Sequence, residues 1–165
     1  MDARVGARDR AWRLGLRLAW LGLRVWWRVA RPETHGVYVA VWSEDRVLLV
    51  RHSYRPGTSL PGGMRRRGEA PAATGARELG EEVGIEVSPE TLRLVGRTQL
   101  HHLGKRDHLH VFRLDLSGDP DVVIDRREIV WAGFQTRDEA LVLELDPAVR
   151  AYLEGRLPAA SPAPG

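Results

Sequence analysis

Three glutamates, Glu78, Glu81 and Glu82, stand close together in a segment whose residues repeat with helical spacing. On a helix that advances about 100° per residue, their carboxylates share a face roughly 100° wide. Clustered carboxylates repel one another unless a cation lies among them. Oxygen ligands suit a hard cation such as Mg²⁺, which commonly bridges protein carboxylates to substrate phosphates. The spacing indicates a metal site, or equally a solvated glutamate-rich helix face, since exposed charge patterns of this kind are common.

A second stripe of this segment is apolar and predicts a helix over 71–83 that packs on a core. The apolar positions gather roughly 100° to 160° away from Glu78: Ala72, Ala76, Leu79 and Val83. Arg77 stands four residues before Glu81, so we expect an ion pair that orients the glutamate. The interior glycines Gly75 and Gly80 each cost about 1 kcal/mol relative to Ala, so the helix must depend on tertiary packing.

The residues around the glutamates resemble the signature of the Nudix hydrolases, G-x5-E-x7-R-E-U-x-E-E-x-G-U, in which U is a bulky aliphatic residue. All nine specified positions match: Gly63, Glu69, Arg77, Glu78, Leu79, Glu81, Glu82, Gly84 and Ile85. Seven fixed identities at frequencies of roughly 5 to 7% match by chance at a given position on the order of once in 10⁸, so the resemblance is specific. It extends more loosely over residues 36–142 and excludes both ends of the chain.

The resemblance implies an α/β fold, an α/β/α sandwich with a mixed sheet, and hydrolysis of a phosphoric anhydride bond. It implies a Mg²⁺ or Mn²⁺ site whose ligands are three glutamates and one backbone carbonyl: Glu78, Glu81, Glu82, and Gly62 or Gly63. Structural roles inside the motif would fall to Gly63, Glu69 and Gly84. The metal would neutralise phosphate oxygens and lower the pKa of a water that attacks phosphorus in line. Because no covalent intermediate is needed, the absence of Cys is no obstacle.

The residue that accepts the proton of the attacking water stays open at this point. The resemblance allows a glutamate of the motif or Glu128, three residues before Trp131, with Asp125 as a weaker substitute. An ordinary exposed glutamate at a strand edge is an equally good interpretation of Glu128, because a lone acid has no specificity. We place Glu128 and Arg77 in the catalytic group beside the three glutamates.

Substrate contacts are expected just upstream of the motif. Arg51 and Arg55 could each take phosphate oxygens bidentately, and Tyr54 could stack on a base. The alternative is a pair of strand-end arginines beside a half-buried tyrosine. No proline or tyrosine typical of particular subfamilies stands near Leu100, so the substrate class stays broad: a nucleoside diphosphate linked to another moiety, or a nucleoside triphosphate.

The rest of the chain predicts a single catalytic domain between two different ends. The 165 residues have a net charge of +3 and no Cys, which excludes a disulfide framework, a Cys zinc site and a thiol nucleophile. Val-rich runs at 36–42 and 46–51 predict a hairpin, and strands are expected near 92–99, 108–116 and 128–134. Short helices are expected at 137–142 and 147–154. The domain spans 33–156, after an N-terminal segment 1–32 and before a disordered Pro/Ala-rich tail at 157–165.

The N-terminal segment is basic and rich in Trp. Residues 1–31 hold eight Arg against two Asp and four of the six Trp. A helix over 10–31 aligns its arginines within about 60° and leaves apolar residues around the remainder. Such a helix fits packing on the catalytic domain or on a second subunit, or lying in a membrane interface; a presequence or nucleic-acid arm fits less well. Its longest uncharged run, 18–23, is too short to cross a bilayer.

The primary hypothesis is a Mg²⁺-dependent Nudix pyrophosphohydrolase that acts on a small-molecule nucleotide and binds no nucleic acid. We expect a cytoplasmic homodimer, with peripheral membrane contact through residues 10–31 as an alternative. Two other functions are open: a nucleotide-binding regulatory domain without turnover, and a membrane-associated hydrolase of lipid-linked diphosphates. An intact motif disfavours the regulatory domain, because a pure binder has no need of three carboxylates.

Overall fold

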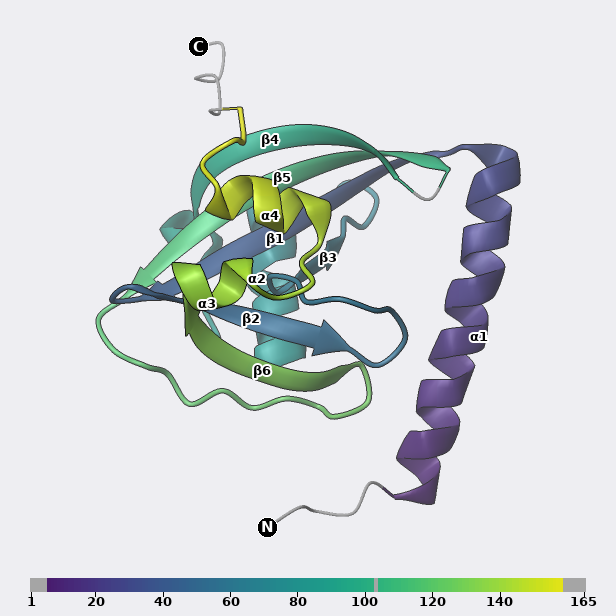
Figure 1. The fold of residues 1–165 in the computed structure, drawn as a ribbon, viewed down its shortest axis with the longest axis horizontal. Helices are drawn as coiled ribbons and strands as arrows, with labels where there is room; N and C mark the ends of the chain where they lie inside the picture. Colours follow the sequence, from purple (N-terminus) through teal and green to yellow (C-terminus); the bar gives the residue numbers. More distant parts are fainter. Residues whose placement is uncertain (1–5, 103, 159–165) are drawn as a thin grey trace.

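A computed structural model describes residues 6–102 and 104–158 and contains an α/β/α sandwich with an additional N-terminal helix (Figure 1). Its elements in chain order are α1 (Ala7–Ala30), β1 (Glu33–Ser43), β2 (Arg46–His52), β3 (Gly62–Met64), α2 (Pro71–Val83), the 3₁₀ turn η1 (Pro89–Thr91), β4 (Arg93–His102), β5 (Lys105–Leu116), β6 (Ile129–Thr136), α3 (Arg137–Leu141) and α4 (Pro147–Leu153). Most of the tail expected at 157–165 lies outside the described residues.

The predicted helices and strands are present, whereas β3 and η1 were not predicted. Among the predicted elements, the largest difference is at the β4–β5 hairpin. The two strands were expected to end at 99 and to begin at 108. The ladder instead continues to the pair His102↔Lys105, at a turn whose Gly104 has φ 84°. Backbone pairing does not require apolar side chains, which is why the polar composition of this hairpin concealed its length.

The sheet is mixed, in the order β4-β5-β1-β2-β6. β1 and β5 pair in parallel from Glu33↔Arg106 to Ser43↔Leu116, and the other pairs are antiparallel. β1 pairs with β2 only beside their shared turn, and the strands then diverge. The short β3 pairs with the first half of β1 in the space that this divergence leaves. The glycines that open the motif are therefore fixed to the sheet next to α2.

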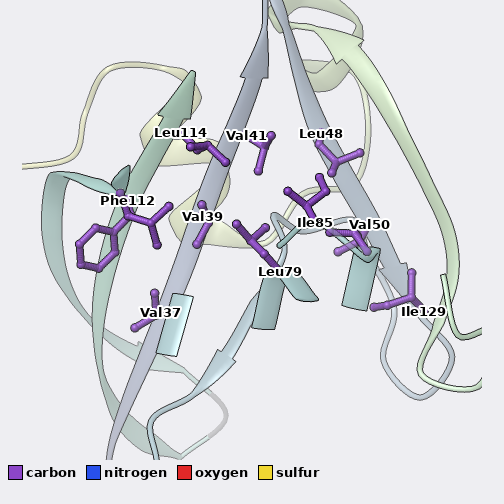
Figure 2. Close-up of a cluster of buried hydrophobic side chains, with 12 residues drawn as sticks. Val37, Val39, Val41, Leu48, Val50, Leu79, Ile85, Phe112, Leu114 and Ile129 are labelled. Atoms are coloured by element: carbon purple, nitrogen blue, oxygen red, sulfur yellow. The ribbon is translucent and has the colours of Figure 1, made fainter. Parts of the chain in front are cut away.

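Two layers of helix cover the two faces of the sheet, because side chains alternate along each strand. Val37, Val39 and Val41 of β1 point to the face covered by α2, where Leu79 packs among them (Figure 2). Tyr38 and Ala40 point to the other face, which α3 and α4 cover. The expected Nudix-type sandwich with a mixed sheet is confirmed.

The helix α2 occupies the predicted range, 71–83, and depends on packing as expected. Leu79 and Val83 are fully buried, and Ala72 and Ala76 pack against the same core. No side chain caps its first turn, and it ends at Gly84, whose φ of 70° is left-handed. A Cβ on the interior Gly75 would lie 2.9 Å from a methyl carbon of the Val39 side chain. The glycine that weakens the helix therefore permits its close approach to β1.

The helix α1 stands beside the sandwich (Figure 1), and the side that faces the domain carries both arginines and apolar residues. Its inner face carries the half-buried or buried side chains Arg13, Leu16, Trp20, Arg24 and Trp27. Two arginine side chains fix it to backbone acceptors: Arg13 donates to the carbonyl of Arg126 and Arg17 to that of Ser53, with Nε–O distances of 3.0 Å each.

The opposite side of α1, its outer face, is apolar and exposed. Its large side chains are each more than half exposed: Leu14, Leu18, Leu21, Val25, Trp26 and Val29. Leu16, Trp20 and Trp27 of the apolar surface pack inward as expected, but part of the arginine stripe also reaches inward to carbonyl groups, and most large apolar residues turn outward. No helix of the described chain is long and apolar enough to cross a membrane.

Candidate active site

The site is built where β3 meets α2, around the buried Glu82 and the largely buried Glu78. The backbone N–H of Gly62 donates to Glu82 Oε2 at 2.8 Å. Gly63 approaches the other glutamate so closely that a Cβ there would lie 2.5 Å from Glu78 Oε1. Both glycines are fixed by antiparallel pairing to β1, so the sheet positions the two carboxylates.

The three glutamates of the motif lie at different depths along one wall of a single cavity. The exposed fraction of the side chain is 5% for Glu82, 13% for Glu78 and 51% for Glu81. All three line the cavity together with Gly62 and Gly63. The interpretation of this face as solvated is excluded for Glu82, whose carboxylate is inside the protein.

Arg77 organises the glutamates without lining the cavity. Its guanidinium lies 2.8 Å from Glu78 Oε1 and 2.9 Å from both Glu81 Oε2 and Glu69 Oε1. The predicted ion pair to Glu81 is therefore present. Hydrogen bonding to Arg77 is the main reason why the pKa of Glu69 falls to about 2. In the structure Arg77 is a positioning residue, and Glu69 links it to the loop before α2 through the N–H of Arg66.

Burial raises the pKa values of Glu78 and Glu82 to about 7. Neighbouring carboxylates add to the burial effect, while Arg77 opposes it at Glu78 and the Gly62 N–H opposes it at Glu82. A buried carboxylate of this kind is stabilised in its charged form by a nearby cation. The donor set of carboxylate oxygens has the chemistry that suits a hard divalent cation.

His52 belongs to this site, although the sequence reasoning passed over it. Its Nε2 lies 3.0 Å from Glu82 Oε1, and the side chain is 2% exposed. Burial, more than the nearby Arg55, lowers its pKa to about 3, which keeps the ring neutral. Ligand atoms of His52, Glu82 and Glu128 lie within 4.8 Å of one another. The irregular pairing of β2 with β6 at Arg51/His52 is invisible in the sequence, so no signal singled this histidine out.

Glu128 reaches the same cavity from the loop before β6. Tyr54 donates its hydroxyl to Glu128 Oε1 at 3.1 Å. Burial first, and Glu82 second, raise the pKa of Glu128. Asp125 acts differently, because its Oδ1 accepts the backbone N–H groups of Arg127, Glu128 and Ile129. Asp125 therefore shapes the loop, and Glu128 is the acid that this loop presents to Glu82.

The three residues expected to bind substrate are divided. Tyr54 and Arg55 line the cavity, and Arg55 lies 3.7 Å from Asp146 Oδ2 and 3.3 Å from Ser59 Oγ. Arg51 is exposed and lies over the Trp131 ring, 4.8 Å from its centroid. Arg51 does not line the cavity, because alternation along β2 turns it away from the buried His52, so its contact with substrate stays a prediction.

A mixed-sheet sandwich whose cavity is lined by buried and exposed glutamates of one motif is the arrangement expected of a hydrolase of phosphoric anhydride bonds. The family model of the NUDIX domain matches residues 32–154, and the chain belongs to the Nudix hydrolase family, which generally uses divalent metals. No curated protein matches the chain.

Solved structures of Nudix proteins share the fold at low sequence identity. The MutT protein of Methanosarcina mazei has a TM-score of 0.67 at 23% identity, covering 76% of this chain and 94% of its own. The MutT NUDIX hydrolase of Burkholderia pseudomallei has a TM-score of 0.66 at 22% identity, covering 74% of this chain and 96% of its own. The dihydroneopterin triphosphate pyrophosphohydrolase of E. coli has a TM-score of 0.61 at 22% identity, covering 74% of this chain and 94% of its own.

Proposed function

We propose that the protein is a Mg²⁺- or Mn²⁺-dependent pyrophosphohydrolase of a nucleoside diphosphate linked to another moiety, or of a nucleoside triphosphate. The observation that carries the proposal is the buried carboxylate of Glu82 beside the largely buried one of Glu78, in a cavity that Glu81 and Glu128 also line. Burying carboxylates costs free energy that only a charged or hydrogen-bonded partner offsets. Such a cost is consistent with a site that works with a cation in place.

The glutamates, the two glycines of β3, Tyr54 and Arg55 each have a role in this proposal. Glu78, Glu81 and Glu82 hold the cation, with a backbone carbonyl of Gly62 or Gly63. When bound, the cation would neutralise phosphate oxygens and lower the pKa of an attacking water. Glu128 accepts the proton of that water, because its raised pKa and its place beside Glu82 suit a general base. Tyr54 and Arg55 contact the substrate.

A substrate panel tests this function. Nucleoside triphosphates, nucleotide sugars, ADP-ribose and dinucleotides are incubated with Mg²⁺ or Mn²⁺, and phosphate-containing products are quantified by chromatography. We expect cleavage of at least one member, and we expect EDTA to abolish it and added metal to restore it. Metal-dependent nucleotide binding by calorimetry without any turnover would support the regulatory domain instead. Cleavage of prenyl or other lipid-linked diphosphates alone would support the third hypothesis.

We propose that the outer face of α1 binds an anionic lipid surface. A contiguous apolar face of this kind marks an interaction site. Residues 1–31 carry eight Arg against two Asp, so anionic headgroups attract the segment, while a second copy of it repels. The expected homodimer therefore does not need this face and stays a prediction, as does the cytoplasmic location.

Co-sedimentation with vesicles tests the lipid proposal. The protein should pellet with vesicles that contain phosphatidylglycerol and should stay in the supernatant with phosphatidylcholine alone. Leu18→Asp, on the outer face, should lower the bound fraction about tenfold, since it removes the burial of one large apolar side chain. Val123→Asp, at an exposed position of the catalytic domain, is the control and should bind vesicles as the wild type does. Equal binding of vesicles by both variants would refute the proposal. If light scattering shows a wild-type dimer that Leu18→Asp dissociates, the outer face binds a second copy of the chain instead.

A further inference from the structure

The catalytic cavity has a wall that the Nudix domain does not supply. The cavity has a volume of about 920 Å³ and lies between the motif and α1. The matched domain begins at residue 32, so α1 is outside it. Six residues of α1 nevertheless line the cavity: Leu16, Ala19, Trp20, Leu23, Arg24 and Trp27. The active site of this chain is therefore completed by its own N-terminal helix.

These six residues form one stripe along α1, since they recur at intervals of three or four positions. Trp27 is 2% exposed, whereas Trp26, the next residue, is 53% exposed on the outer face. All but Arg24 are apolar. The glutamates stand on the motif side of the cavity, so its two sides have opposite character: acidic groups suited to a metal and phosphates, and an apolar wall.

A chain of aromatic contacts joins the wall to the catalytic carboxylates. Trp20 packs edge-on against Trp27 with 5.2 Å between ring centroids, and 5.7 Å separates Trp20 from Tyr54. Tyr54 in turn donates to Glu128. Lys105 lies over the Trp27 ring, 4.5 Å from its centroid, and pairs with Asp107. The wall is thus held by side chains of the domain, and its position relative to Glu128 is defined.

The size and character of the cavity determine what kind of molecule it suits. A volume of about 920 Å³ is at the upper end for small-molecule sites and leaves room beyond a diphosphate. Apolar side chains that face an open cavity gain free energy when an apolar group displaces their water. A ligand whose phosphates lie at the glutamates would place its far end against α1.

We propose that α1 forms a binding subsite for an apolar group, aromatic or prenyl, on the non-reacting end of the substrate, with Trp20 as its central residue. The proposal rests on the proposed function, because the glutamates must hold the diphosphate end. Arg24 borders the same wall and is suited to a further anionic group of the substrate.

Binding of three probes to full-length protein tests this subsite. Inorganic diphosphate has no apolar end, ADP has an aromatic end and geranyl diphosphate has a prenyl end. Affinities are measured by calorimetry with Ca²⁺ in place of Mg²⁺, so that binding is read without turnover. The wild-type protein should bind ADP or geranyl diphosphate about tenfold more tightly than inorganic diphosphate, the gain expected for burying one apolar group. Tighter binding of ADP would indicate a subsite for an aromatic end, and tighter binding of geranyl diphosphate would indicate a subsite for a prenyl end.

Trp20→Ala should remove this gain and leave the affinity for inorganic diphosphate unchanged. Trp26→Ala, on the outer face of the same helix, is the matched control and should change neither affinity. Leu16→Ala gives a second, smaller change at the same wall, and circular dichroism checks that α1 stays helical in each variant. Equal losses for all three probes, or no loss in either inner-face variant, would overturn the subsite.

The two proposals can fail separately. If the wild-type protein hydrolyses no phosphoric anhydride but shows the binding pattern above, the hydrolytic part of the proposed function fails, while diphosphate binding at the glutamates and the subsite both stand. If turnover is present and the apolar probes bind no better than inorganic diphosphate, the subsite is wrong and the proposed function stands.

Discussion

Glu82→Gln should lower metal-dependent hydrolysis about a thousandfold, the size of effect seen when one strong electrostatic contribution to a transition state is lost. The amide keeps the size of the side chain and an acceptor for the Gly62 N–H, but it lacks the charge that a divalent cation requires. The rate is measured on whichever substrate the panel identifies. Glu86→Gln, an exposed acid outside the cavity, is the matched control and should retain wild-type turnover.

Glu82→Gln lowers activity, but it should make the folded protein more stable than the wild type above about pH 7 in the absence of metal. Burial raises the pKa of Glu82 to about 7, so the folded protein binds an extra proton between its unfolded value, near 4.5, and about pH 7. Stability therefore falls as pH rises through this window, and Glu82→Gln removes that part of the loss.

Thermal denaturation in EDTA at about pH 5 and about pH 8 measures this effect. The midpoint of the wild-type protein should fall more between the two values than that of the variant, and Mg²⁺ should restore the wild-type midpoint at the higher pH. An equal or steeper fall in the variant would contradict the burial of a charged Glu82. A loss of activity together with a lower midpoint at both values would point to misfolding.

Gly62→Ala should destabilise the protein by about 3 kcal/mol or more, through strain and a steric clash together. The residue has φ 147°, and a Cβ there would lie 2.0 Å from the carbonyl oxygen of Val37. The obstacle is backbone of the central strand β1, which cannot move without breaking its pairing with β5. Relief by displacement of β3 would also break the Gly62 N–H bond to Glu82.

Gly68→Ala is the control that separates strain from the clash. Gly68 also has a positive φ, of 78°, but open space surrounds the position of its Cβ. It should cost about 1 kcal/mol, the cost of a left-handed conformation alone. Both free energies of unfolding are measured in urea. Similar values for the two variants would show that β3 yields to the added methyl group, and that the sheet does not fix the motif.

The motif was readable because its chemistry lies in local spacing. A helix over 71–83 places Glu78, Glu81 and Arg77 relative to one another without any knowledge of the rest of the chain. The apolar stripe that ends in Leu79 and Val83 likewise identified the packed face. The structure adds depth to this local picture: Glu82 is buried and Glu81 is not, although both stand on the face that the sequence assigned to acid.

The parts that sequence reasoning missed depend on contacts between distant segments. Alternation along β2 separates His52, beside Glu82, from Arg51, over Trp131, but only the packing of β2 in the fold shows which of the two faces the glutamates. For α1, periodicity identified two kinds of surface but not which one faces inward. That choice depends on carbonyl acceptors at Ser53 and Arg126, which no pattern in residues 10–31 encodes.

The parallel pairing of β1 with β5 also limits how early the sheet can form during synthesis. Glu33 pairs with Arg106, 73 positions later, and the ladder is complete only when Leu116 is present. Pairing over such separations slows folding, because the loop must close before its contacts form. During synthesis α1 leaves the ribosome long before the sheet that will hold its inner face. The nascent chain therefore exposes every tryptophan of α1 at once, which makes it a candidate client for chaperones until β5 arrives.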